Sequence, residues 1–273
     1  MSRYTRKLNL VNPMVTGIIA LLFLYPIVWI LTTAYKPVRD IFSVPPSFTF
    51  TPILKNFTDL FAIFNIPGLL ANSLMIGVGT TVMALLLGVP CGYALARSKT
   101  RYANAIAFSL LAIRMMPRVV TLLPFYLMMR SVDLLGTVWA VIIFDTTLSA
   151  GFVVWTMYAY FKALPVEAEQ AAQLDGRSRV GAFVFVAIPL VIPGIISSAL
   201  FTLILAWNDF IGPVFLTGSE SKPLSVAILS SYGTKDVSWG TMGAMSHFSV
   251  LPIVLIAMLL NRYFVKGMTK GMH

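Results

Sequence analysis

The sequence is short of charge. Only 11% of its 273 residues are Asp, Glu, Lys or Arg, whereas soluble globular proteins carry about 25%. The deficit extends along the whole chain, and 58% of the residues are hydrophobic. An ordinary soluble domain is therefore excluded. We expect a polytopic membrane protein with several helices of roughly 20 residues each and no sizeable soluble domain.

Cysteine and histidine are scarce too. A single cysteine, Cys91, excludes an internal disulfide framework and a thiolate metal cluster. It lies in an apolar run, where a packed free thiol is expected. Only two histidines are present, so no metal site is expected. Of these, His247 is expected to be a satisfied histidine at a helix end.

The chain also lacks the G-x-x-x-x-G-K-[ST] loop that cradles nucleotide phosphates. It is therefore expected to bind no cofactor and to hydrolyse no ATP itself. Its polar residues are scattered rather than convergent, which disfavours a membrane-embedded enzyme with a catalytic site. The net charge of +10 could indicate nucleic-acid binding. Lys and Arg also concentrate in the cytoplasmic loops of membrane proteins, and no nucleic-acid partner is expected.

Six apolar segments predict an all-α fold with six transmembrane helices, forming a single transmembrane domain over residues 1–273. The expected spans are 13–35, 69–96, 105–129, 137–161, 183–207 and 246–265. The first segment follows three cations, as a signal peptide would. It is longer than the roughly 7–15 apolar residues of a signal peptide and shows no clear cleavage site. It is therefore expected to be a retained span.

The distribution of Lys and Arg predicts the orientation, because these residues are enriched in cytoplasmic loops. With the N-terminus inside, twelve cations lie inside and six outside, in loops that are mostly longer. The inside group is Arg3, Arg6, Lys7, Arg97, Lys99, Arg101, Lys162, Arg177, Arg179, Arg262, Lys266 and Lys270; the outside group is Lys36, Arg39, Lys55, Arg130, Lys222 and Lys235. Both termini and the segment 164–182 are therefore expected to be cytoplasmic.

A polar stretch, LPVEAEQAAQLDGRSRVGAF, separates the fourth and fifth spans. Pro165 suits the first turn of a helix, and Glu167 and Glu169 follow where the helix dipole favours negative charge. Asp175-Gly176 predicts a turn, after which a second helix runs from the two arginines toward the membrane at Phe183. We expect two short helices that meet at Gly176 and project into the cytoplasm. Local sequence alone leaves open an ordinary solvated loop.

The order of residues in this stretch is informative. The pattern L-P-x-E-x-x-x-A-A-x-x-D-G, followed by F-x-x-x-x-x-P-L-x-x-P, resembles the signature of the inner-membrane permeases of ATP-binding-cassette (ABC) importers. In that family the segment is a coupling helix that docks on a cytoplasmic ATPase. The resemblance implies this role for Glu167, Gln170, Ala171, Ala172, Asp175, Gly176 and Arg177. The family usually has glutamate where this chain has Gln170, which puts an ion pair at that position in doubt.

Other stretches resemble the carbohydrate-type branch of the family and its maltose-type subunit. They are Asn72-Ser73-Leu74, Gly92 to Arg97, Met116-Pro117, Pro124 to Tyr126, Leu134 to Thr137, Ala206 to Phe210, and the ending from Arg262 to Gly271. The resemblance implies a bacterial plasma (inner) membrane location and four kinds of partner. These are a second permease subunit, two ABC ATPase subunits that hold ATP and Mg, an external solute-binding protein, and a carbohydrate solute. The chain itself is expected to be embedded in the lipid bilayer.

Polar residues within or beside the spans are candidates for the solute path, because charges in a membrane are costly and mark a pathway or a pair. They are Arg114, Arg118, Asp145, Trp207, Asn208 and Asp209. Asp145 could form a structural pair with an arginine or contact the solute. Arg114 and Arg118 are four residues apart and are expected on one helix face, where they could meet an anionic sugar derivative.

An alternative function is a self-contained, proton-coupled secondary transporter that uses Asp145. Such transporters show internal symmetry and paired broken helices, and neither is apparent in the sequence. The carried solute stays open between sugar, oligosaccharide, sugar alcohol and charged sugar derivative, because specificity in such importers rests largely with the external binding protein. The two arginines slightly favour a charged derivative.

Overall fold

The computed structural model describes residues 2–230 and 238–269, and the side chains of residues 13–229, 238–256 and 258 within them. In these ranges the chain forms helices and no strand beyond an isolated bridge between Gly136 and Thr217. The predicted all-α membrane fold is confirmed. Lys270 and Gly271, the end of the predicted C-terminal motif, lie outside the described residues.

Four described helices are long and apolar enough to cross a membrane without a break. They are α1 (Ser2–Thr33), α4 (Ile66–Arg97), α7 (Val138–Ala163) and α14 (Trp239–Thr269). The last begins at Trp239, seven residues before the predicted start of the sixth span at 246. Each of the other two predicted spans is a bent pair of helices, so the described helices give up to six spans.

The third predicted span is broken between Met115 and Arg118. The helix α5 (Ala103–Ala112) and the short turn η1 (Ile113–Met115) meet α6 (Arg118–Ser131) at an angle of 90°. Met116 is extended (φ −67°, ψ 138°), and Pro117 follows it. A residue before proline avoids the helical region because its backbone clashes with the proline ring. This explains the break.

The fifth span is broken near Val191. Its first part comprises α9 (Arg179–Ala182), the π-helical turn η2 (Phe183–Ala187) and α10 (Ile188–Leu190). Its second part, α11 (Ile192–Trp207), is turned by 74°. Proline inside a helix removes a hydrogen bond and clashes with the preceding turn, and Pro193 lies at the start of α11. The sequence did not reveal either broken span.

The chain forms two compact units. The first comprises residues 2–66, 228–230 and 238–250, with α1, α2 (Val38–Ile41), α3 (Lys55–Ile63) and the beginning of α14. The Asn56 amide donates to the carbonyls of Ala34 (2.8 Å) and Lys36 (3.1 Å), which fixes α3 against the end of α1. The His247 ring is packed between Tyr35 and Phe57, and its Nδ1 lies 3.0 Å from the carbonyl of Gly243. These two ring contacts and the contact with the Gly243 carbonyl give His247 a structural role.

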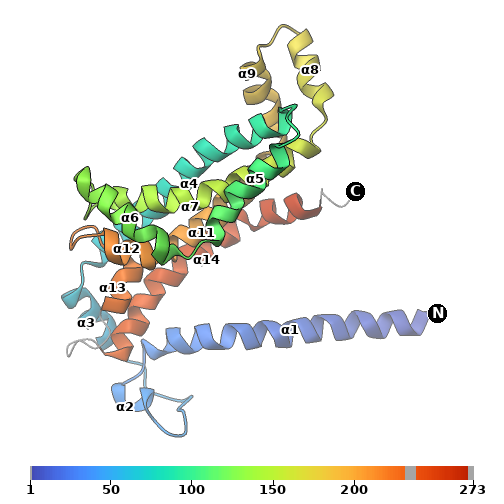
Figure 1. Ribbon diagram of the computed structural model, residues 1–273. Coiled ribbons are helices and arrows are strands. Elements are labelled where there is room, and N and C mark those ends of the chain that lie inside the picture. Colours follow the sequence, from blue (N-terminus) through green and yellow to red (C-terminus); the bar gives the residue numbers. More distant parts are fainter. Residues whose placement is uncertain (1, 231–237, 270–273) are drawn as a thin grey trace. The chain divides into compact units, whose positions relative to one another are not determined.

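The second unit comprises residues 67–227 and 251–269 and is built around α7. Figure 1 shows α4, α5 and α11 beside α7. Glycines allow the close approach: a Cβ on Gly92 would lie 2.8 Å from the Cβ of Met157, and one on Gly151 would lie 2.1 Å from the carbonyl oxygen of Leu110. Small residues at helix contacts are typical of membrane proteins, where helices associate mainly by close packing.

Two short helices, α12 (Ile211–Leu216) and α13 (Leu224–Ser230), follow α11. The amide of Asn72, near the start of α4, donates to the carbonyls of Glu220 (2.8 Å) and Lys222 (3.0 Å). The loop before α13 is therefore held to the second unit.

Candidate coupling site and candidate solute path

The polar segment forms the expected helical hairpin. Its first helix is α8 (Val166–Leu174), and Gly176 makes the turn with φ +87°, a conformation that glycine adopts without strain. The second helix, α9, begins at Arg179 rather than at Arg177, because the Ser178 side chain caps it by accepting a hydrogen bond from the Gly181 amide (3.1 Å). In Figure 1 the hairpin projects beyond α4 and α7.

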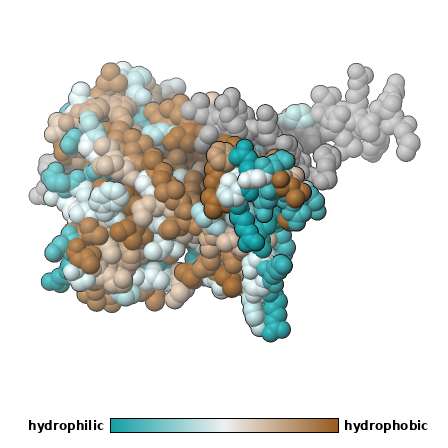
Figure 2. Space-filling model, turned by 90° about the horizontal axis from the view of Figure 1, so that it is seen from above, coloured by the Kyte–Doolittle hydropathy of each residue, from teal (hydrophilic) through white to brown (hydrophobic). Residues whose placement is uncertain are grey.

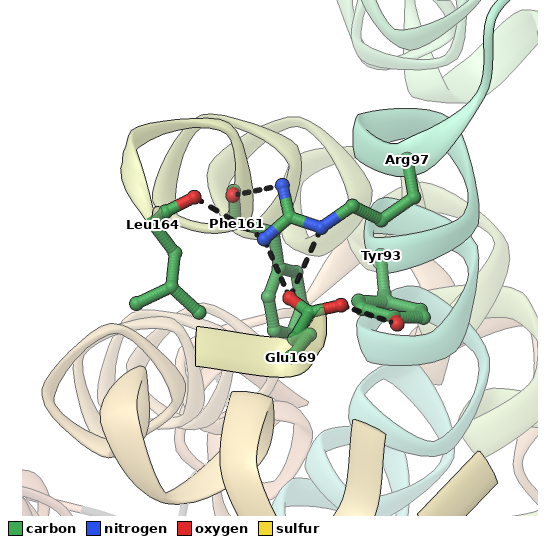
Figure 3. A network of polar contacts seen from close by, with 5 residues as sticks. All are labelled: Tyr93, Arg97, Phe161, Leu164 and Glu169. Atoms are coloured by element: carbon green, nitrogen blue, oxygen red, sulfur yellow. Dashed lines mark hydrogen bonds and ion pairs between the residues drawn. The ribbon is translucent and has the colours of Figure 1, made fainter. Parts of the chain in front are cut away.

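One face of α8 is fixed to the end of α4 by a buried ion pair. Glu169 is 2% exposed, and its Oε1 lies 2.6 Å from Nη2 and 3.0 Å from Nε of Arg97. Its Oε2 accepts a hydrogen bond from the Tyr93 hydroxyl at 2.7 Å. Figure 3 shows the carboxylate lying between these two side chains. An ion pair offsets the cost of removing its two charges from water when further hydrogen bonds satisfy the remaining atoms, as they do for both oxygens of this carboxylate.

The same guanidinium also holds the end of α7. Arg97 donates from Nη1 to the carbonyl of Phe161 (2.9 Å) and from Nη2 to the carbonyl of Leu164 (3.3 Å). These carbonyls belong to the last turn of a helix, where backbone acceptors lack intrahelical partners. The planar guanidinium offers several donors in fixed directions. Arg97 thereby joins α4, α7 and α8, and we call Tyr93, Arg97 and Glu169 the clamp.

The opposite face of α8 is free of intrachain contacts that bury it. Its residues Glu167, Gln170, Ala171 and Leu174 are exposed, and Leu174 is 89% exposed. We call these four residues the outer face. Figure 2 shows hydrophilic side chains gathered on the hairpin, beside a largely hydrophobic surface. The outer face is therefore partly polar, with Leu174 as its large apolar side chain.

The structure places the seven predicted coupling residues on this hairpin. Ala172 is buried, whereas Glu167, Gln170, Ala171, Asp175, Gly176 and Arg177 are exposed. The Arg177 guanidinium lies 4.8 Å from the centre of the Phe185 ring. Because Gln170 points away from the clamp, its lack of charge leaves the ion pair intact. The ion pair is made by the preceding residue, Glu169, with Arg97.

Sequence reasoning missed the clamp and Leu174. A signal for the clamp was present, because Tyr93 and Arg97 are four residues apart on one helix and share a face. Their partner Glu169 is distant in the sequence by 72 residues from Arg97. Only the tertiary structure brings the three side chains together.

The predicted path residues fall into two groups in the second unit. In the first, Arg118 forms an ion pair with Asp209, whose side chain is 4% exposed. The Oδ2 of Asp209 also accepts a hydrogen bond from the Gly212 amide at 3.2 Å. Asp145 is 3% exposed, and its Oδ2 has no hydrogen-bond partner among the described residues. The arginine pairs with Asp209 rather than with Asp145.

Arg114 stands apart from this group. The expectation that Arg114 and Arg118 share one helix face is wrong, because the helix breaks between them and turns by 90°. The Arg114 guanidinium lies 5.4 Å from the centres of both the Phe152 and the Phe201 rings. Guanidinium groups within about 6 Å of an aromatic ring are attracted to its face.

Trp207 and Asn208 are arranged less favourably for sugar contact. Trp207 is 5% exposed and contributes to the interior. Asn208 is exposed, but its amide donates to the Ile204 carbonyl of its own helix at 2.7 Å. Of the predicted path residues, the two arginines and Asn208 are the most accessible.

Comparison with known proteins now identifies the family. The family model described as "Binding-protein-dependent transport system inner membrane component" matches residues 84–270. The chain belongs to this family. This membership favours the permease over the proton-coupled transporter, even though the structure contains the two broken spans that the sequence did not reveal.

Relatives agree over nearly the full length. The chain is 30% identical over 270 residues to the probable ABC transporter permease protein y4oR of Sinorhizobium fredii, with 99% of this chain and 96% of the relative covered. It is 29% identical to the trehalose transport system permease protein SugB of Mycobacterium tuberculosis, with 91% of each covered. The sequence similarity therefore extends over nearly the whole chain.

A solved structure has the same fold. It is a bacterial ABC transporter involved in the import of the acidic polysaccharide alginate, and the TM-score is 0.77 at 24% identity. The match covers 97% of this chain and 99% of the other. The fold of the chain is thus that of an ABC importer permease.

Proposed function

We propose that the chain is a permease subunit of an ATP-driven importer, that it forms half of a pore for a sugar or sugar derivative, and that the α8–α9 hairpin couples it to an ATPase. One observation carries the proposal. The inner face of α8 is fixed to α4 and α7 by the clamp, and its outer face presents Leu174 to a partner. Movement of a docked partner is transmitted to two membrane helices because the hairpin is bonded to both.

The proposed partners follow from the family. Two ABC ATPase subunits supply the energy and hold ATP and Mg, since this chain has no phosphate-binding loop. A second permease completes the pore, and an external solute-binding protein delivers the solute. The proposed mechanism is alternating access by rocking of packed helices. ATP-driven closure of the ATPase pair pulls the hairpin, and the long helices turn the pore outward.

The proposed location is a bacterial inner membrane with both termini cytoplasmic. Twelve cations on the predicted inner side against six on the outer side support this orientation. The hairpin and the clamp then lie on the side where ATP is present. A sugar-class solute is supported by the relative named for trehalose transport.

The test changes the outer face of α8 without touching the clamp. Leu174→Asp places a carboxylate where an apolar contact is proposed, so the ATPase should no longer dock. The chain is affinity-purified from its native membrane, and co-purifying proteins are identified by mass spectrometry. The wild-type chain should bring down an ABC ATPase and a second permease. The variant should retain the permease but lose most of the ATPase.

Gln173→Asp serves as the matched control. It adds the same charge one residue earlier, to the side of the outer face, and should retain the ATPase. Retention of the ATPase by Leu174→Asp, with normal ATP-dependent transport in proteoliposomes, would show that the hairpin is not the coupling element. Transport by the chain alone without ATP would overturn the importer function itself.

A further inference from the structure

The break in the third span interrupts the helical hydrogen bonding of the backbone between Met115 and Arg118. Met115 is 81% exposed and Met116 is 48% exposed, so the chain itself does not cover the break. Irregular backbone at membrane depth is tolerated where it is buried in protein or lines a water-filled cavity. In transporters, broken helices form the sites at which solutes and ions bind.

A charge at this break has no counter-charge. In the part of the chain that the structure describes, Arg114 makes no ion pair, whereas Arg118 is paired with Asp209. A cation in a membrane segment is costly and usually has a partner or lies in a pathway. Arg114 therefore lacks the compensation that Arg118 has.

The surroundings of Arg114 orient it without occupying its donors. Phe152 on α7 and Phe201 on α11 lie with ring centroids 4.5 Å apart, and the guanidinium is 5.4 Å from each centroid. An aromatic ring attracts the guanidinium through its face. The N–H groups, which lie in the guanidinium plane, stay available for a planar anion such as a carboxylate.

From this geometry we propose that Arg114 is an anion-binding residue of the solute path and that the solute is an acidic sugar, carrying a carboxylate or a sulfonate. The inference rests on the proposed importer function and specifies its solute class. The anionic group pairs with the Arg114 guanidinium at the break, and Phe201, which is 42% exposed, offers an apolar ring face to the sugar ring. Arg118 is not assigned this role, because Asp209 already neutralises its charge.

Two other sources of a negative group fit the same guanidinium. One is the phosphate of a membrane lipid, and the other is a carboxylate of the second permease. A lipid would leave Arg114 out of contact with bulk water. A partner carboxylate would leave it unavailable to solutes. The experiment separates these possibilities from the proposal.

The first measurement is accessibility in the assembled complex. Arg114→Cys is introduced with Cys91→Ser, so that the new thiol is the only one in this chain, and is treated with a charged methanethiosulfonate reagent. Leu86→Cys is the control, because Leu86 is 68% exposed in the middle of α4 and belongs to an apolar span. Fast labelling at 114 and slow labelling at 86 is expected. Equally slow labelling at both positions would overturn the proposal.

The second measurement is binding of two matched probes, trigalacturonate and maltotriose, to the permease–ATPase complex in nanodiscs without the solute-binding protein. Wild type should prefer trigalacturonate. Arg114→Gln should weaken its binding by roughly 10- to 100-fold, the usual effect of losing a hydrogen bond to a charged group. Arg114→Lys should restore part of it. Maltotriose binding should change little.

Arg130→Gln removes an arginine at the other end of α6 and should leave the preference unchanged. Equal binding of the two probes by wild type, or unchanged trigalacturonate binding in Arg114→Gln, overturns the inference. Loss of a co-purified anionic lipid in Arg114→Gln without loss of probe binding assigns the residue to lipid instead. If the wild-type chain fails to assemble with an ATPase, the proposed function itself has failed.

Discussion

Arg97 and Glu169 lie 72 residues apart in the sequence and form a buried ion pair, with 2.6 Å between Nη2 and Oε1. The pair joins the last turn of α4 to the middle of α8. Since Arg97 also donates to two carbonyls at the end of α7, a single side chain fixes the hairpin to both helices. The hairpin is therefore a rigid extension of the membrane helices rather than a flexible loop.

Removal of the carboxylate should disrupt this extension. We expect Glu169→Ala to lower the free energy of unfolding by about 3 kcal/mol or more, because a buried charge left without its partner is strongly destabilising. Coupling should fail as well, so that ATP hydrolysis continues in the complex without transport. Thermal unfolding of the purified complex and transport per ATP hydrolysed are the measurements.

Glu167→Ala is the control for the unfolding measurement alone, because Glu167 also belongs to the outer face. Glu167 is exposed on the same helix, and a surface substitution of this kind changes stability by about 0.5 kcal/mol or less. Arg97→Lys keeps the charge but lacks the planar set of donors, and its effect should lie between wild type and Glu169→Ala. A Glu169→Ala complex with unchanged unfolding and full coupling would contradict a role for the clamp.

The crossing of α5 and α7 depends on Gly151. A Cβ at this position would lie 2.1 Å from the backbone carbonyl oxygen of Leu110, which is too close for any contact. Gly151→Ala should therefore separate the two helices and cost about 1–3 kcal/mol, as overpacking of a core does. The midpoint of thermal unfolding should fall accordingly.

Gly17→Ala is the matched control for this substitution. No atom lies within 4 Å of the corresponding Cβ position in α1, and alanine is favoured over glycine in a helix. The control should keep or slightly raise the unfolding midpoint. Equal midpoints for both variants would mean that the crossing is looser than the structure indicates.

The pair between Arg118 and Asp209 can be tested by a double-mutant cycle. Asp209→Asn keeps an oxygen for the Gly212 amide but removes the charge that Arg118 meets. We expect Asp209→Asn and Arg118→Gln to destabilise the protein singly, and the double variant to be less destabilised than the sum. A coupling energy of about 0.5–3 kcal/mol is expected for residues in direct contact.

Additive effects in this cycle would contradict a structural pair. Both residues would then remain candidates for direct solute contact. A coupling energy in the expected range, with transport reduced only as far as stability is reduced, would assign the two residues to structure and leave Arg114 as the charge available to a solute.

The sequence by itself determined the membrane class, the helical fold, the six apolar segments and the hairpin with its turn at Gly176. These features depend on composition, on the length of apolar runs and on local turn chemistry, all of which act between near neighbours. The residue order from Leu164 to Pro193 also indicated the family, which comparison confirmed.

Only the tertiary structure decided which charges meet. Glu169 forms an ion pair with Arg97, and Arg118 forms one with Asp209. Arg114 lies near two aromatic rings and forms no ion pair with Asp145. Each of these contacts joins segments that are distant in the sequence, and a one-dimensional pattern carries no information on how such segments pack. The break at Pro117 was equally decisive, because it separated two arginines that an unbroken helix would have placed on one face.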